Sequence, residues 1–314
     1  MNIEEIAFFR DQNLEYINTI AQGGFGLIFY VYNTLYKSEF ALKKIPIDHF
    51  NQSEIDSLLT IDDPHIVRLY KYYIFNGYVY LLMEYCPSDL EKFLCDRQKY
   101  ISPCLIQNTL SEIARCVKAC HDHKIAHCDI KTSNFLVDRY GRLKIADFGM
   151  ATMCNRSKPS TSFHGTLLFM APEIFGINYY NPTRADIWAM GVTMYYIVTG
   201  KYPFNGLDQR AVKDSVEKGI YSQELIHDSL LRDMISRCLE TDLMYRATID
   251  EILAHPYFEK TFSSGIMSPN QRSTDNIVRP SIPSGRKLNR NRSHNTFMLS
   301  SFSRVHTQIP TIIE

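Results

Sequence analysis

The segment His127-Cys128-Asp129-Ile130-Lys131-Thr132-Ser133-Asn134 carries the most specific pattern in this chain. It places a carboxylate, a lysine and a carboxamide within six residues, and Asp147-Phe148-Gly149 begins thirteen residues after Asn134. An aspartate can orient a hydroxyl group and accept its proton, a lysine can neutralise a transferring phosphoryl group, and an asparagine can ligate Mg²⁺. Each residue alone could lie in an ordinary loop, but their order in one chain favours phosphoryl-transfer chemistry.

A glycine cluster, Gly23-Gly24-Phe25-Gly26, lies between two segments of strand-like composition, residues 17–20 and 27–32. A glycine-rich hairpin lets backbone N–H groups approach a phosphate without interference from Cβ atoms. By itself the cluster is weak evidence, because most such clusters are tight turns.

A lysine ends the apolar pattern Phe40-Ala41-Leu42-Lys43. Lys43 could neutralise phosphate charge if an acid held it inward, and Glu54, eleven residues later, is the candidate partner. The alternative is a solvated lysine at a strand end, which is what we expect of Lys44. Surface ion pairs are common and weak, so the pairing alone predicts little.

The apolar periodicity changes at about residue 89. Before it, short runs predict a mostly β lobe with strands in residues 16–20, 27–32, 40–42 and 78–83 and one helix over 52–59. After it, longer patterns predict a mostly α lobe with helices over residues 104–123, 185–199, 230–239 and 249–254. Gly200 is expected to stop the second of these helices.

The chain is neutral overall, with 34 Lys and Arg against 34 Asp and Glu in 314 residues, which gives no footprint for nucleic-acid or membrane-surface binding. Residues 259–314 nevertheless carry eight basic and three acidic residues, so they are +5 and the remainder is −5. With ten serines and four prolines, this segment is expected to be a disordered basic tail.

Eight cysteines are scattered along a chain too long to need disulfide stapling. There is no signal-peptide pattern, and the most apolar stretch is far shorter than the ~20 residues of a membrane span. We therefore expect a reduced protein of the cytoplasm or nucleus.

Cysteines and histidines between Cys116 and Cys128 could form a zinc site, although thiols on one helix face are more typical of packing.

Taken together, these motifs resemble the eukaryotic protein kinase family over about residues 14–258. The resemblance implies an α+β, bilobal protein-kinase fold. Its parts would be a head of residues 1–13, an N-lobe 14–83, a hinge 84–88, a C-lobe 89–258 and the tail 259–314. Further similarities lie in Ala171-Pro172-Glu173, which resembles the end of the activation segment, in residues 186–191, which resemble a central buried helix, and in Arg246, which resembles the arginine that pairs with Glu173.

The resemblance also assigns roles. It makes Asp129 the general base or hydroxyl-orienting acid, with Lys131 beside it, and places Asn134 and Asp147 on Mg²⁺. Lys43 would hold the α- and β-phosphates of ATP with Glu54 as its partner. The implied nucleotide site comprises Ile20, Ala21, Gln22, Gly23, Gly24, Phe25, Gly26, Ile28, Ala41, Lys43, Met83, Glu84, Tyr85, Cys86, Asp89, Leu136 and Asp147.

Lys131 and Thr166 resemble the serine/threonine pattern, and residues 200–206 and 246–258 resemble the calmodulin-dependent and AMP-activated kinase group. The implied activity is transfer of the γ-phosphate of Mg-ATP to Ser or Thr of protein substrates by a monomer that binds neither nucleic acid nor membranes. The alternative is a pseudokinase that acts as a nucleotide-binding scaffold. All five residues that discriminate the two are present: Lys43, Glu54, Asp129, Asn134 and Asp147.

Two positions depart from the family pattern. Ala21 stands where the family usually has its first glycine, so we expect a weaker grip on the nucleotide. Cys128 stands where most members have an arginine that pairs with a phosphorylated activation loop. We therefore expect that activity is not switched through this contact, despite Ser157, Ser160, Thr161 and Ser162 in the segment.

Overall fold

The computed structural model describes residues 2–23, 26–50, 52, 55, 58, 61–95, 102–153, 167–176 and 180–261. All of these belong to the first of the two units into which the chain divides, Met1–Ser263. Several sequence predictions fall outside the described residues: Gly24, Phe25, Glu54, Thr166, the four activation-segment hydroxyl residues and the tail beyond residue 261.

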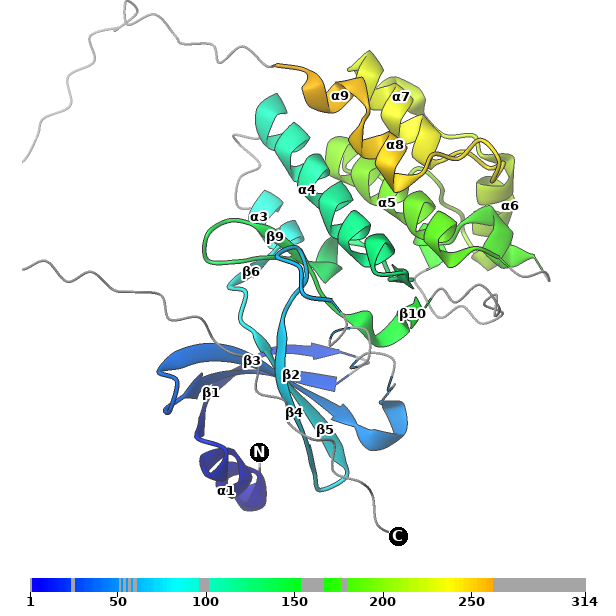
Figure 1. Cartoon of the computed structure of the whole chain (residues 1–314). Coiled ribbons are helices and arrows are strands. Elements are labelled where there is room, and N and C mark those ends of the chain that lie inside the picture. Colours follow the sequence, from blue (N-terminus) through cyan, green and yellow to red (C-terminus); the bar gives the residue numbers. More distant parts are fainter. Residues whose placement is uncertain are drawn as a thin grey trace, which may run out of the picture. The chain divides into compact units, whose positions relative to one another are not determined.

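An antiparallel five-stranded sheet forms the small lobe, with the strand order β1-β2-β3-β5-β4 (Figure 1). Its strands are β1 (Leu14–Gly23), β2 (Gly26–Asn33), β3 (Ser38–Pro46), β4 (Leu69–Phe75) and β5 (Tyr78–Glu84). The four predicted strand segments lie within β1, β2, β3 and β5 and are confirmed. Of the predicted helix over 52–59, the described positions Gln52, Ile55 and Leu58 are helical.

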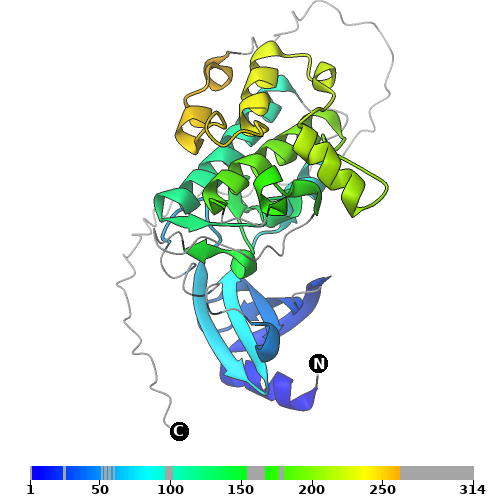
Figure 2. The ribbon, with the colours of Figure 1, turned by 90° about the vertical axis from the view of Figure 1, so that its right-hand side faces the viewer.

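A helix that the sequence patterns did not predict, α1 (Ile3–Asp11), precedes the sheet. It begins at Asn2, whose side chain accepts a hydrogen bond from the Glu5 N–H at 2.8 Å, as N-cap residues do. Phe9 is 1% exposed and packs edge-on against Phe29 and Tyr80. The helix therefore closes a separate apolar cluster on the sheet, at the end of the small lobe away from the helical lobe (Figures 1 and 2).

The large lobe is mostly helical (Figure 2). Its helices are α3 (Leu90–Cys95), α4 (Pro103–Asp122), α5 (Pro182–Thr199), α6 (Gln209–Lys218), α7 (Ser229–Cys238), α8 (Ile249–Leu253) and α9 (Pro256–Glu259). Helix α5 passes through the core and has eleven buried residues. Gly200 ends it in the left-handed conformation, with φ of 70°, which confirms the predicted glycine stop.

Short strands position the loops between the lobes. A three-stranded sheet has the order β6 (Ser88–Asp89), β8 (Phe135–Val137), β9 (Leu143–Ile145), and β7 (Ile125–Ala126) pairs with β10 (Thr152–Met153). The loop 127–134 connects β7 to β8, and Asp147 follows β9 closely. The small β lobe and the large helical lobe together confirm the α+β, two-lobed architecture predicted from the sequence.

Candidate active site

The backbone of the loop 127–134 is held by a buried carboxylate on α5. Asp186 is 1% exposed and accepts hydrogen bonds from the backbone N–H groups of His127 at 2.8 Å and Cys128 at 2.9 Å. Its Oδ2 also lies 3.0 Å from Nε2 of His121. Cys128 adopts a left-handed φ of 64°, and these contacts fix the loop at that turn.

The three functional side chains of this loop contact one another. Lys131 Nζ donates to Asp129 Oδ2 at 2.7 Å, and Asn134 Nδ2 donates to the same oxygen at 3.0 Å. Asn134 Nδ2 also donates to the backbone carbonyl of Asp129 at 2.7 Å. Asp129 and Asn134 are 7% and 6% exposed. The carboxylate is therefore preorganised by one cation and one amide.

Asp147 meets the lysine of β3 across the two lobes. Its Oδ1 lies 2.9 Å from Lys43 Nζ, although the residues are 104 positions apart. Burial alone raises the pKa of the Asp147 carboxyl, but the charge and hydrogen bond of Lys43 outweigh it, so the pKa lies below its usual value. The sequence patterns did not predict this contact. The predicted partner Glu54 lies outside the described residues, and that pairing stays a prediction.

Phe148, the residue after Asp147, connects the loop that follows β9 to the loop 127–134. Phe148 is fully buried, and its ring meets the His127 ring edge-on at 4.9 Å between centroids. Nε2 of His127 lies 2.9 Å from the carbonyl oxygen of Ala146. Displacement of either loop would thus disturb the other.

The glycine hairpin closes where the sequence predicts. Gly23 pairs with Gly26, and Ala21 pairs with Ile28. Gly26 has a φ of 128°, and a Cβ there would lie 2.0 Å from the backbone oxygen of Lys44, so only glycine fits. Ile20, Ala21 and Gln22 are exposed, so strand pairing is what holds this part of β1.

The segment that connects the lobes is anchored through a buried lysine. Lys144 of β9 is 5% exposed, and its Nζ lies 3.0 Å from Glu84 Oε2 and 2.8 Å from the Pro64 carbonyl oxygen. The Tyr85 ring stacks on Tyr30 of β2 at 4.3 Å. Burial, together with the nearby charge of Glu84, raises the pKa of the Cys86 thiol to about 12. Sequence reasoning did not identify Lys144 or Tyr30.

The remaining predicted nucleotide residues lie on paired strands. Ala41 pairs with Met83, Ile28 pairs with Lys43, and Asp89 pairs with Leu136. Met83 is buried, whereas the Asp89 carboxylate accepts the backbone N–H of Lys92 at 2.7 Å and so caps α3. The described members of the predicted site thus lie on the five-stranded sheet, on the three-stranded sheet and in the segments that follow β5 and β9.

The expectation that Lys44 is solvated is wrong. Its side chain is 15% exposed, and its Nζ lies 2.7 Å from Glu5 Oε1 and 4.0 Å from the centroid of the Tyr78 ring. The physical reason is α1, which covers the face of the sheet to which Lys44 points.

The predicted pair of Arg246 and Glu173 is confirmed. The guanidinium makes two parallel contacts with the carboxylate, at 2.7 and 2.9 Å, and the Arg246 side chain is fully buried. Such a bidentate pair fixes the end of the activation segment against the large lobe.

In the described part of the chain, no group of three or more His, Cys, Asp or Glu side chains is placed to hold a metal ion, so the geometry does not support the zinc alternative. The Cys116 thiol donates to the Leu143 carbonyl oxygen, and Cys116 and Cys120 are both fully buried. Burial raises the pKa of both thiols. Cys116 and Cys120 are thus packing residues.

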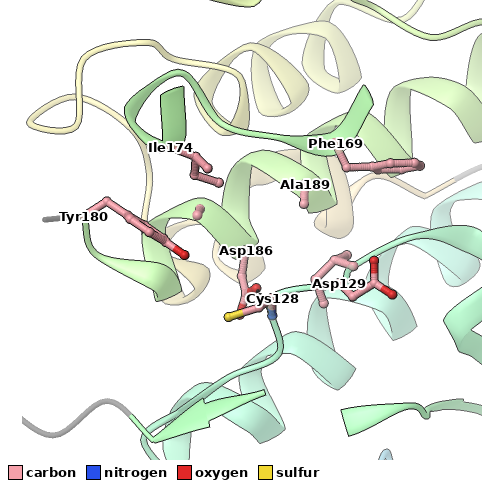
Figure 3. A pocket seen from close by; sticks show the side chains of 9 residues that line it. Cys128, Asp129, Phe169, Ile174, Tyr180, Asp186 and Ala189 are labelled. Carbon is pink, nitrogen blue, oxygen red and sulfur yellow. Dashed lines mark hydrogen bonds between the residues drawn. The ribbon is translucent and has the colours of Figure 1, made fainter. Parts of the chain in front are cut away.

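Cys128 and other residues of the loop 127–134 line a small cavity (Figure 3). Asp129, Asp186, Phe169, Ile174 and Tyr180 also line it. Among the cysteines whose side chains the structure describes, six in number, none forms a disulfide. No helix in the described ranges is long and apolar enough to cross a membrane.

A β lobe and a helical lobe that bring Lys43, Asp129, Asn134 and Asp147 into one region define the bilobal kinase fold. The model of the protein kinase domain family matches residues 14–258, and the chain belongs to this family.

Several curated relatives are similar to the chain. Sperm motility kinase 3A of Mus musculus is 28% identical over 254 residues, which cover 80% of this chain and 50% of the relative. Mitosis inducer protein kinase cdr1 of Schizosaccharomyces pombe is 31% identical over 219 residues, 69% of this chain and 37% of the relative. Carbon catabolite-derepressing protein kinase of Secale cereale is 30% identical over 197 residues, which cover 62% of this chain and 39% of the relative. The chain thus spans half or less of the length of these relatives.

Proposed function

We propose that the chain is a serine/threonine protein kinase that transfers the γ-phosphate of Mg-ATP to hydroxyl groups of protein substrates. The observation that carries the proposal is the buried carboxylate of Asp129, which contacts both Lys131 and Asn134. A carboxylate preorganised in this way can accept a hydrogen bond from a serine or threonine hydroxyl, orient it and take its proton.

The residues present fit a magnesium nucleotide. The carboxamide of Asn134 and the carboxylate of Asp147 offer the oxygen ligands that Mg²⁺ prefers, and the lowered pKa of Asp147 keeps it ionised at neutral pH. When bound, the metal ion supplies charge neutralisation at the phosphates. In our proposal Lys43 binds the α- and β-phosphates, and Lys131 neutralises charge near Asp129 at the acceptor.

The serine/threonine preference is supported by Lys131 in the catalytic loop. Similarity to a carbon catabolite-derepressing kinase and to cdr1 supports membership of the AMP-activated branch of the family. We further propose a kinase domain over residues 14–258, with its N-lobe, hinge and C-lobe as predicted, that acts as a monomer on protein substrates in the cytoplasm or nucleus. The match of the family model supports the extent of that domain.

The two departures from the family pattern leave the local geometry intact, which favours the enzyme over the pseudokinase. Ala21 pairs with Ile28 of β2 directly after a shift in register between Thr19 and Ala21. Its φ is not positive, so the position does not require glycine. Cys128 keeps its backbone contact with Asp186.

The test is transfer of radiolabelled γ-phosphate to a generic basic protein by the wild type and by Asp129→Asn. We expect a loss of about 10²-fold or more, because asparagine retains the shape of the side chain but not the base. Asp122→Asn, at an exposed position of α4, is the matched control and should keep full activity. Silence of the wild type and both variants would support the pseudokinase instead.

A further inference from the structure

Helix α1 buries a charged group that the proposed chemistry does not use. Glu5 is 5% exposed, and its Oε1 accepts hydrogen bonds from Lys44 Nζ at 2.7 Å and from the Tyr80 hydroxyl at 2.8 Å. A carboxylate buried in this way is costly unless it is paired, so the helix docks in one defined register on β3 and β5.

Aromatic contacts surround this polar group. The Phe8 ring stacks on Phe75 at 4.3 Å and lies 5.3 Å from Tyr80, while Phe9 fills the apolar cluster beneath the helix. At the rim, Asn76 Nδ2 donates to Glu4 Oε2 at 3.3 Å. The helix is thus attached to β3, to β5 and to the turn between β4 and β5.

Lys44 is the point at which this helix meets the nucleotide site. Its side chain is bound by Glu5, and its backbone oxygen lies against Gly26 at the base of the glycine hairpin. The residue before it, Lys43, points to the other face of the sheet and contacts Asp147. One peptide segment therefore connects the helix to the phosphate-binding lysine and to the hairpin.

We propose that α1 is a positioning element for the nucleotide site, with Glu5 and Lys44 as its positioning residues. The helix holds β3 from the face opposite the nucleotide and so fixes Lys43 and the base of the glycine hairpin. This inference rests on the proposed kinase function, because it concerns the same site. Without the helix, Lys44 loses its contact with Glu5, and β3 becomes more mobile at this point. Part of the binding free energy of the nucleotide is then used to order β3, so the affinity is lower.

Nucleotide affinity tests the inference. The dissociation constant for Mg-ATP is measured by calorimetry on the full chain for the wild type, Glu5→Ala, Lys44→Ala and the double variant. We expect each single variant to weaken binding by about tenfold, since misplacement of a positioning group is costly. The double variant should be no worse than either single one, because the two residues act as a unit.

A matched control separates positioning from general stability. Thr248→Ala removes the capping box of α8 in the large lobe, far from the nucleotide residues, and should lower the melting temperature without changing Mg-ATP affinity. If Glu5→Ala unfolds the protein, Glu5→Gln replaces it, because glutamine removes the charge but can still accept both hydrogen bonds.

Amide hydrogen exchange in the absence of nucleotide provides a readout that does not depend on kinase function. We expect Glu5→Ala to increase exchange across residues 38–46 and in the glycine hairpin, and Thr248→Ala to leave both unchanged. Wild-type affinity together with wild-type exchange in Glu5→Ala would overturn the inference and leave the kinase proposal standing. If the wild type binds no Mg-ATP, the kinase proposal fails, and unchanged exchange in β3 would overturn the positioning role as well.

Discussion

The catalytic loop and the glycine hairpin are held in place by different means. His127, Asp129 and Asn134 of the loop are buried. Asp186 of α5 binds the backbone of the loop, and Lys131, itself a loop residue, binds Asp129. On the hairpin, residues 20–22 are exposed and are connected to the rest of the molecule through strand pairing. The difference indicates that the half of the site to which we assign the acceptor is rigid in itself, whereas the half to which we assign the nucleotide takes its position from β3 and from the elements that pack behind that strand.

We expect the largest effect from Asp186→Ala, which perturbs the loop 127–134. Two backbone N–H groups of the loop would lose their acceptor, and we expect phosphate transfer to fall by about 10²-fold or more while Mg-ATP affinity falls by much less. Asp186→Asn retains one acceptor oxygen and should lose less. Steady-state kinetics and calorimetry measure the two effects, and an equal loss of affinity and turnover would contradict the separation of the two halves.

Gly26→Ala perturbs the glycine hairpin, in the half of the site to which we assign the nucleotide. The new methyl group would clash with the Lys44 carbonyl, so we expect Mg-ATP affinity to fall by about tenfold. Gly77→Ala is the control, because Gly77 also has a positive φ, of 76°, but a Cβ at that position would meet no heavy atom within 4 Å. Calorimetry should therefore find near-normal affinity for the control. Equal losses in both variants would show that backbone strain alone explains the effect.

Ala21→Gly is expected to strengthen nucleotide binding, whereas Gly26→Ala is expected to weaken it. Glycine would restore freedom at the first position of the loop, and we expect KM for ATP to fall by about two- to threefold with an unchanged kcat. Initial rates at varied ATP concentration measure it. An unchanged or higher KM would mean that Ala21 does not weaken the grip on the nucleotide.

The smallest effect concerns pH and α1. Burial raises the pKa of Glu5, but the hydrogen bonds from Lys44 and Tyr80 and the charge of Lys44 outweigh it, so the pKa is lowered. A carboxyl group with a lowered pKa stabilises the fold above its unfolded pKa, and the stabilisation is lost as the pH falls through the folded value. The wild type should exceed Glu5→Gln by about 1 kcal/mol in unfolding free energy at pH 7, and the difference should shrink as the pH falls below the usual pKa of a glutamate carboxyl. Denaturant titrations at several pH values measure it, and a constant difference would refute the assignment.

The parts of the fold that sequence predicts best are those with local signals. Helix α5 combines a long apolar run with a glycine stop, and the catalytic loop carries its roles in eight consecutive residues. Helix α1 was missed because it has nine residues and the contacts that stabilise it are distant: Glu5 meets Lys44 and Tyr80, 39 and 75 positions away. No local pattern distinguishes Lys43 from Lys44. The burial of Lys44 depends on its contact with α1, and the sequence patterns did not predict that helix.

The contact between Lys43 and Asp147 shows the same limit within the site. The two motifs were recognised separately, but a contact across 104 positions depends on how the lobes close on each other. Lys144 was missed for a related reason, because a lysine in a strand pattern is ordinarily a surface residue. Its burial follows from Glu84 and the Pro64 carbonyl, which together satisfy its ammonium group.

The raised pKa of Cys86 determines how the protein will respond to thiol-directed reagents. Burial raises its pKa to about 12, so the thiol is almost entirely neutral at neutral pH, and the neutral form is a poor nucleophile. Among the six cysteines whose side chains the structure describes, Cys104 at the start of α4 is the exposed one. Electrophiles, including those carried on a nucleotide-like scaffold, should therefore modify the outer surface of the large lobe before they modify the connection between the lobes.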